Sequence, residues 1–163
     1  MSEHEPLFEA LAGRFRQDGV VTWIGLRPVK RGPMKVVESV DAEPSVGLIG
    51  DHYSSTSGKR HVTLLDASHL AVIGDHLGQP PVDPTLLRRN LLIRGMNLLA
   101  LKDRRFTIGD VVLEYTGPCH PCDKMEQALG PGGWNAMRWH GGIHARVLER
   151  GTIRVGHPVS FLD

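Results

Sequence analysis

The residues with the clearest chemical potential form the tetrapeptide Cys119-His120-Pro121-Cys122, which holds both cysteines of the chain. We expect Cys122 to open a short helix over residues 122–129, where backbone N–H groups and the helix dipole favour a thiolate. Such a thiolate could serve as a nucleophile, as a carrier of persulfide sulfur or as a ligand for a soft metal. The plainer interpretation, a buried free cysteine that packs as a small hydrophobic residue, stays open beside these.

The same cysteines belong to a pattern that superficially resembles a zinc site. Cys119 and Cys122 are followed by His140 and His144, which gives C-x2-C…H-x3-H. The gap between Cys122 and His140 is longer than in a zinc finger, and Gly141-Gly142 would break a helix that carried both histidines. Structural zinc is therefore a minor alternative. A thioredoxin-like redox pair needs a βαβ context that is missing here, and it is less favoured still.

Two further clusters are candidates for anion binding. Gly50-Asp51-His52 is followed by a loop rich in Ser, Thr and Gly that ends at Lys59-Arg60, and Arg88-Arg89-Asn90 precedes an apolar segment. Backbone N–H groups and arginine side chains in such loops can hold phosphate or carboxylate. A plain hairpin loop and a solvated helix end explain the two clusters equally well. The sequence has no G-x-G-x-x-G after a strand and no Walker loop, so nucleotide cofactors of those kinds lack support.

The elements that must position these residues are mostly strands. Apolar and β-branched segments bounded by Gly and Pro predict strands at 20–26, 34–40, 61–65, 91–93, 96–101, 106–115 (a hairpin turning at 109–110), 143–148, 152–155 and 159–162. Short helices are predicted at 6–15, from Asp66 to about His76, and at 122–129. Strands and helices do not alternate regularly, so the pattern favours a β-rich barrel or sandwich over a doubly wound parallel sheet.

Composition sets limits on the function. The 163 residues predict one domain, and 19 Lys and Arg against 18 Asp and Glu leave a formal charge of +1, which gives nucleic acid no electrostatic footprint. No segment approaches the roughly 18 apolar residues of a membrane helix. The acidic N-terminus does not resemble a secretory signal, so we expect a cytoplasmic protein without a membrane partner. Two cysteines are too few for a disulfide scaffold.

Seven segments in this order resemble the MOSC family, named for the C-terminal domain of molybdenum cofactor sulfurases. They are Val46-Gly47-Leu48-Ile49-Gly50-Asp51-His52, Arg60-His61-Val62-Thr63-Leu64, Arg88-Arg89-Asn90-Leu91, Phe106-Thr107-Ile108-Gly109-Asp110, Pro121-Cys122, Gly141-Gly142-Ile143-His144-Ala145-Arg146-Val147-Leu148 and Gly151-Thr152-Ile153-Arg154-Val155-Gly156. The resemblance covers residues 20–163 and implies a mainly β fold, a closed strand-rich barrel of the pyruvate-kinase β-barrel type with a few short peripheral helices. Residues 1–19 are then expected to form a helical segment packed on this single domain.

The resemblance also implies roles for individual residues. Cys122 would bind the molybdenum of a pterin cofactor or carry sulfur toward it. Arg88 and Asn90 match the Arg-x-Asn that holds the pterin and its phosphate in amidoxime-reducing relatives, and Arg60 is a further anion contact. His144 stands where relatives often carry a tyrosine near the metal, and Cys119 where small bacterial members often have arginine.

Three functions follow as expectations. The leading one is a molybdenum-cofactor protein that reduces N-hydroxylated small molecules, with electrons from a flavin or iron–sulfur partner and Cys122 as both metal ligand and catalytic residue. The second is a sulfur carrier that receives a persulfide on Cys122 from a cysteine desulfurase. The third is a small non-enzymatic domain stabilised by zinc. No pyridoxal phosphate site is expected, because the desulfurase domain of the full sulfurases is not part of this sequence.

Overall fold

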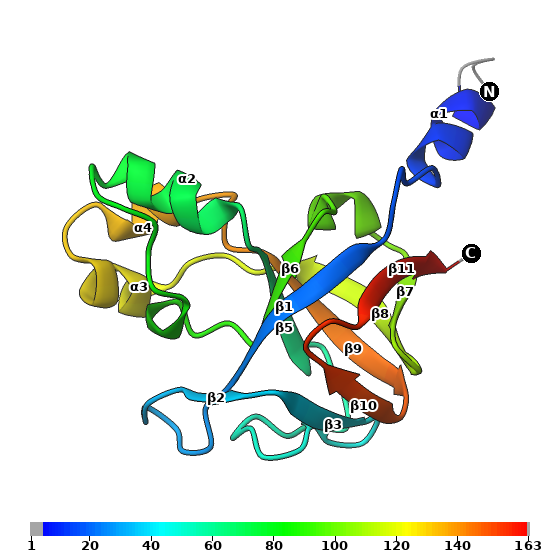
Figure 1. Cartoon of the computed structure of the whole chain (residues 1–163), viewed down its shortest axis with the longest axis horizontal. Helices are drawn as coiled ribbons and strands as arrows, with labels where there is room; N and C mark the ends of the chain where they lie inside the picture. The colour runs from blue at the N-terminus through cyan, green and yellow to red at the C-terminus, as the bar shows by residue number, and fades with distance from the viewer. Residues whose placement is uncertain (1–4, 163) are drawn as a thin grey trace.

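The computed structural model describes residues 5–162, and seven of its strands close into a barrel, which can be followed in Figure 1. Each strand pairs with the next in the order β1 (Gly19–Leu26), β11 (Pro158–Leu162), β7 (Arg105–Ile108), β8 (Val111–Pro118), β9 (Ile143–Glu149), β5 (Val62–Asp66) and β6 (Leu91–Arg94), and β6 pairs back with β1. All these pairs are antiparallel except β5–β6. The mainly β barrel expected from the sequence is confirmed.

A second, smaller sheet lies beside the barrel. It consists of β3 (Ser39–Glu43), β4 (Gly47–Leu48) and β10 (Gly151–Arg154), while β2 (Lys35–Val37) extends the barrel sheet from the edge of β1. The single strand predicted at 34–40 is therefore two strands, divided at Glu38 and belonging to different sheets. The two-residue β4 is too short to produce a periodic signal in the sequence.

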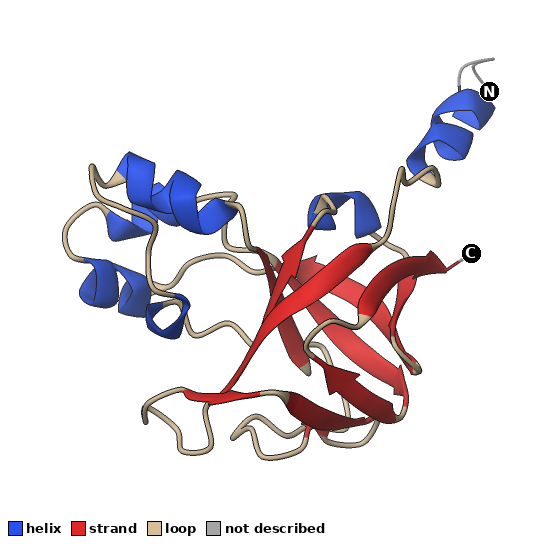
Figure 2. Ribbon diagram, in the orientation of Figure 1, coloured by secondary structure: helices blue, strands red, loops and turns tan. Residues whose placement is uncertain are grey.

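A group of helical segments lies on one side of the barrel (Figure 2). They are α2 (His69–His76), α3 (Asp123–Leu129), α4 (Gly133–Met137) and the 3₁₀ turn η1 (Pro84–Leu86). Helix α2 and η1 lie in the crossover from β5 to β6, because two parallel strands cannot be joined by a tight hairpin. Helix α4 was not predicted, since its sequence follows Gly130-Pro131-Gly132 and reads as a loop.

Strands β5 and β6 separate two apolar cores. Leu64 and Leu91 face the barrel interior, whereas Leu65 and Leu92 face a second cluster that contains Ile73, Met125 and Met137 beneath the helices. Both faces of these strands are buried, which explains their nearly continuous apolar sequence. The barrel is thus anchored to the helical layer through the two strands that also lead into the candidate site.

Two segments differ from the expectations. The strand predicted at 96–101 contains the 3₁₀ helix η2 (Leu98–Leu101): Asn97 caps it by accepting a hydrogen bond from the Leu99 backbone N–H, and Leu98 and Leu101 are buried at i, i+3 spacing. Helix α1 (Glu5–Ala12) extends away from the barrel (Figure 1), with Leu11 44% exposed.

Contact between the N-terminal segment and the barrel begins at Phe15, which stacks on Phe161 with 5.3 Å between the ring centroids. Residues 1–4 of the segment predicted to pack on the domain lie outside the described residues. Within residues 5–162, no helix has the length and apolar character needed to cross a bilayer.

Candidate functional site

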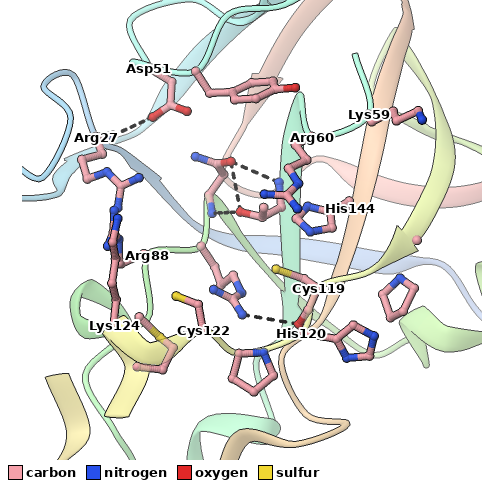
Figure 3. Close-up of a pocket in the computed structure, with 18 of the residues that line it drawn as sticks. Arg27, Asp51, Lys59, Arg60, Arg88, Cys119, His120, Cys122, Lys124 and His144 are labelled. Carbon is pink, nitrogen blue, oxygen red and sulfur yellow. Dashed lines mark hydrogen bonds between the residues drawn. The ribbon is translucent and has the colours of Figure 1, made fainter. Parts of the chain in front are cut away.

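A cavity of about 650 Å³ lies where the barrel meets the helical layer (Figure 3). Its wall includes all five residues singled out from the sequence, Arg60, Arg88, Asn90, Cys122 and His144, together with Cys119 and part of the loop from Asp51 to Arg60. The volume falls in the range of sites that bind cofactors and other small ligands. Segments far apart in the sequence are therefore brought together around one cavity.

Cys122 is exposed at the wall of this cavity, directly before helix α3. The predicted helix is confirmed, although it begins one residue later, at Asp123, with Cys122 as its N-cap. The backbone N–H of Met125 donates to the Cys122 carbonyl over 2.9 Å, and the indole N–H of Trp134 donates to the Pro121 carbonyl over 3.0 Å. These bonds hold the backbone on both sides of the thiol while leaving the sulfur accessible.

Cys119 has a different environment, although it lies in the same cavity wall. It is buried, and its backbone N–H donates to the Gly142 carbonyl over 2.8 Å. Burial raises the pKa of the Cys119 thiol, and the nearby charges of Arg89 and Arg60 oppose that rise only in part. Cys119 is thus a protonated packing residue, whereas Cys122 is the thiol that a ligand can reach.

Arg89 forms the floor beneath the cysteines and is only 6% exposed. Its guanidinium donates from Nε to the Gly141 carbonyl over 2.7 Å and from Nη1 to the Leu87 carbonyl over 2.8 Å, and Nη2 lies 3.5 Å from the Cys119 carbonyl. No carboxylate among the described residues forms an ion pair with it. Its positive charge is therefore uncompensated and raises the electrostatic potential of the cavity.

Asn90 is buried, and its side chain makes hydrogen bonds to other residues of the chain. Its Oδ1 accepts hydrogen bonds from the backbone N–H and the hydroxyl of Thr63, and its Nδ2 donates to the Gly25 carbonyl over 3.1 Å. Its side chain ties β1 and β5 together at the start of β6. The structure thus gives Asn90 a positioning role beside the cavity. The other member of the Arg-x-Asn pair, Arg88, has no side-chain hydrogen bond within the described residues.

His144 enters the cavity from β9 and is half-buried. Burial lowers the pKa of its imidazole to about 4, with further lowering by the charges of Arg60, Arg89 and His120. The ring is consequently neutral at physiological pH. Its Nδ1 is buried and has no hydrogen-bond partner among the described residues, so a ligand in the cavity could supply one.

One side of the cavity is a cationic wall, formed by Arg27, Arg88 and Lys124 (Figure 3). None of the three pairs with a carboxylate within the described residues, and Nε and Nη1 of Arg27 are buried without a hydrogen-bond partner there. Arg88 adopts a φ of 60°, a left-handed conformation that costs a non-glycine residue about 1 kcal/mol or more. Unpaired cations on one wall, one of them at a strained backbone position, suit an anionic ligand.

Asp51 is the carboxylate of this cavity, and it does not neutralise the cationic wall. Its Oδ1 accepts a hydrogen bond from the Arg27 backbone N–H over 2.8 Å. Burial raises the pKa of Asp51, and the charge of His52 and hydrogen bonds from nearby groups oppose the rise. Its role is to fix the backbone at the end of β1, from which the Arg27 side chain projects.

The zinc interpretation is not supported. Within residues 5–162, no three His, Cys, Asp or Glu side chains are grouped so that they could hold a metal ion. His140 does not join the cysteines: its ring centroid lies 4.9 Å from that of His69 and 5.4 Å from that of His76, on the helical layer. The C-x2-C…H-x3-H spacing therefore does not form a zinc site.

Sequence reasoning missed Arg27 and Lys124 as site residues. Arg27 follows the predicted strand 20–26 directly, and Lys124 lies in the first turn of the predicted helix after Cys122. Each lies next to the end of a strand or helix that the sequence predicts, but neither belongs to a motif. The two cations come together with Arg88 only in the folded chain, where all three line the same cavity.

Comparison with known proteins agrees with this fold. The YuaD protein of Bacillus subtilis has the same fold, with a TM-score of 0.77 at 17% identity over 89% of this chain and 96% of that one. YiiM of Geobacillus stearothermophilus (TM-score 0.68, 16% identity, 89% and 75% covered) and YiiM of Escherichia coli (0.67, 16%, 88% and 70%) are also similar. No curated protein sequence matches. The model of the MOSC domain matches residues 48–160, and the chain therefore belongs to the MOSC domain family.

Proposed function

We propose that this protein binds a molybdenum–pterin cofactor in the cavity, with Cys122 as the protein ligand to the metal. Membership of the MOSC family supports a function related to the molybdenum cofactor in general. The observation that carries the finer proposal is the combination of one exposed thiol, on Cys122, with a wall of unpaired cations in the same cavity. A soft thiolate suits a metal of this kind, and cations suit the phosphate of a pterin.

The residues present fit such a group better than they fit a bare metal ion. Because no three ligating side chains are grouped within the described residues, a metal bound at Cys122 must bring its other ligands with it. A pterin cofactor does so through its dithiolene sulfurs. The unpartnered nitrogens of Arg27 and of His144 supply hydrogen-bonding groups for the rest of the ligand.

The chain's own residues then have distinct tasks. Arg88, Arg27 and Lys124 would hold the phosphate, and Arg89 would keep the cysteine loop fixed while its charge favours anionic groups nearby. His144, neutral at physiological pH, would orient a substrate by hydrogen bonding. When bound, the cofactor supplies two-electron redox chemistry at a Lewis-acidic metal.

The reaction that we propose is the reduction of N-hydroxylated compounds. A hydroxylamine takes up two electrons and two protons, the N–O bond breaks, and the amine and water are released. The electrons would come from a flavin or iron–sulfur protein, which makes such a protein the expected partner. Conversion of hydroxylamines and amidoximes by the loaded protein with a chemical reductant tests this step, and absence of turnover would contradict it.

The cofactor proposal is tested by replacing Cys122 with alanine. Protein purified from cells that make the cofactor and are supplied with molybdate should hold close to one molybdenum per chain by elemental analysis, and Cys122→Ala should hold almost none. Cys119→Ala is the matched control and should retain the metal, because Cys119 is buried and protonated. Full molybdenum occupancy in folded Cys122→Ala would refute the proposal.

A second function is favoured by the contrast between the two thiols. An exposed Cys122 beside a protonated, buried Cys119 suits a sulfur carrier that takes a persulfide from a cysteine desulfurase. Incubation with a desulfurase and cysteine should then add one sulfur, about 32 Da, to the peptide that contains Cys122. Mass spectrometry of Cys122→Ala treated in the same way provides the control, and an unmodified wild-type peptide would contradict this function.

A further inference from the structure

A second group of cations lines the same cavity, away from the cationic wall. It consists of Lys59 and Arg60, and Figure 3 shows Arg60 next to His144, with Cys122 between this pair and the cationic wall. Neither cation forms an ion pair within residues 5–162, and the Arg60 side chain has no hydrogen bond there. Among the described residues, the cavity lining has a single carboxylate, that of Asp51, which is bonded at the end of β1. The side near Arg60 therefore has positive charge without a counter-ion from the described part of the chain.

The loop that carries these two cations is fixed to the barrel. The hydroxyl of Thr116 on β8 donates to the Lys59 carbonyl, and Nε of Arg146 on β9 donates to the Ser57 carbonyl over 2.9 Å. Arg146 also pairs with Glu114, with 3.3 Å between Nη1 and Oε1, so its own charge is compensated. The backbone of the loop is thus held in place, while its two cationic side chains remain available to a ligand.

Arg60 and His144 face the same part of the cavity. Burial lowers the pKa of the His144 imidazole to about 4, and the charge of Arg60 is the next largest cause of that decrease. The Nδ1 atom of His144 is buried and has no hydrogen-bond partner among the described residues. A guanidinium can bind a carboxylate through two parallel hydrogen bonds, and a neutral imidazole can bond to a hydroxyl group. The pair therefore suits a ligand that carries both groups.

We infer that the substrate is an N-hydroxylated compound that also carries a carboxylate. Arg60 binds the carboxylate, Lys59 adds attraction at the rim of the cavity, and His144 bonds to the N-hydroxyl group. The inference rests on the proposed function and adds the class of substrate. The phosphate of the cofactor and the carboxylate of the substrate then lie on different sides of Cys122, so the two anions do not compete for the same cations.

Turnover of two matched compounds tests the class of substrate. Benzamidoxime and 4-carboxybenzamidoxime are supplied to the loaded protein with reduced methyl viologen: two viologen radicals give two electrons, two protons are taken up, the N–O bond breaks, and the amidine and water are released. We expect kcat/KM to be about tenfold or more higher for the carboxylate compound, in line with one contact to a charged group. Arg60→Met should remove most of that preference. Arg94→Met, at an exposed arginine outside the cavity lining, should keep it. Equal kcat/KM values for the two compounds in the wild type would overturn this inference and leave the proposed function standing.

A binding measurement decides the inference without any turnover, so a protein that reduces neither compound contradicts the proposed function alone. The probes are benzoate and benzamide, which share a ring and differ in charge, titrated into the purified protein by calorimetry. Benzoate should bind about tenfold or more tighter, and this difference should shrink at high salt because Arg60 is exposed. Arg60→Met should remove most of the difference, and Arg88→Met, in the cationic wall, should remove less of it. Benzoate binding no tighter than benzamide, or binding that depends on Arg88 and not on Arg60, would overturn the inference.

Discussion

Replacing Arg89 should destabilise the fold and change the electrostatics of the cavity at the same time. The two short hydrogen bonds from Arg89, to the carbonyls of Gly141 and Leu87, are each expected to contribute roughly 1.5–3 kcal/mol because the donor is charged. Removing the guanidinium also releases its desolvation cost, which offsets part of that loss. For Arg89→Met we therefore expect a net decrease of about 2–4 kcal/mol in the free energy of unfolding, a large share of the stability of a small domain.

Two measurements separate the geometric role of Arg89 from its charge. Urea unfolding gives the stability, and an NMR titration of His144 reports the charge, because Arg89 is one of the causes that lower the pKa of His144. Arg89→Met should raise that pKa. Arg89→Lys should keep it low while still losing stability, since one ammonium group cannot reach both carbonyls in the same way.

The neighbouring Arg88 provides the control, because its side chain makes none of the hydrogen bonds found among the described residues. Arg88→Met should unfold within about 0.5 kcal/mol of the wild type, as is usual for substitutions outside buried networks. If Arg89→Met also unfolds within that margin and leaves the pKa of His144 unchanged, the assignment of Arg89 as the charged floor of the cavity is refuted.

Three further predictions follow from the same region. Gly142→Ala should cost about 3 kcal/mol or more in urea unfolding, because a Cβ would lie 1.9 Å from the Leu64 carbonyl oxygen; Gly156→Ala, with a similar φ of 95° and open space around it, should cost only about 1 kcal/mol. Arg88→Gly should raise the stability of the unloaded protein by up to about 1 kcal/mol, because glycine adopts the positive φ without strain. The same substitution should weaken the binding of inorganic pyrophosphate, measured by calorimetric titration. The unloaded protein should lose stability as the pH falls from 6.5 toward 4: the pKa of His144 drops to about 4 on folding, so the unfolded state binds the proton first. That loss, about 2 kcal/mol at pH 4.5 after allowance for partial exposure, should disappear from the pH profile of His144→Gln.

The barrel strands were predictable because their sequences have clear local signals. The hairpin of β7 and β8 turns at Gly109-Asp110 as expected, and the apolar runs of β5 and β6 are buried on both faces. The predictions of secondary structure were wrong where a helix cap or a run of glycines decides the local structure against the apolar composition of the segment. Asn97 turns an apolar segment into the 3₁₀ helix η2, and the glycines before α4 hide a helix that is stabilised by its packing. Neither effect has a period that a sequence pattern can detect.

Some residues of the site could be predicted from the sequence, but their individual environments could not. Cys122, Arg60, Arg88 and His144 were singled out from sequence motifs, and all four line the cavity. The difference between two adjacent arginines was not predictable, because it depends on the backbone. The positive φ of Arg88 accompanies a side chain that lies in the cavity wall, whereas Arg89 is turned beneath the cysteine loop. The pair Arg88-Arg89 therefore divides into a residue whose side chain has no hydrogen bond within the described residues and one whose side chain is bonded to three backbone carbonyls.

The floor and the wall of the cavity are constructed differently, and this has a consequence for function. The floor consists of backbone segments in direct contact: a Cβ on Gly141 would lie 2.2 Å from the Cys119 carbonyl oxygen, and Arg89 bonds to carbonyls of both segments. Changes there alter the fold itself. The wall consists of side chains, Arg27, Arg88 and Lys124, whose removal leaves these backbone contacts intact. Substitutions in the wall can therefore change the anion preference that we propose, while the floor keeps the backbone around Cys122 at a fixed position.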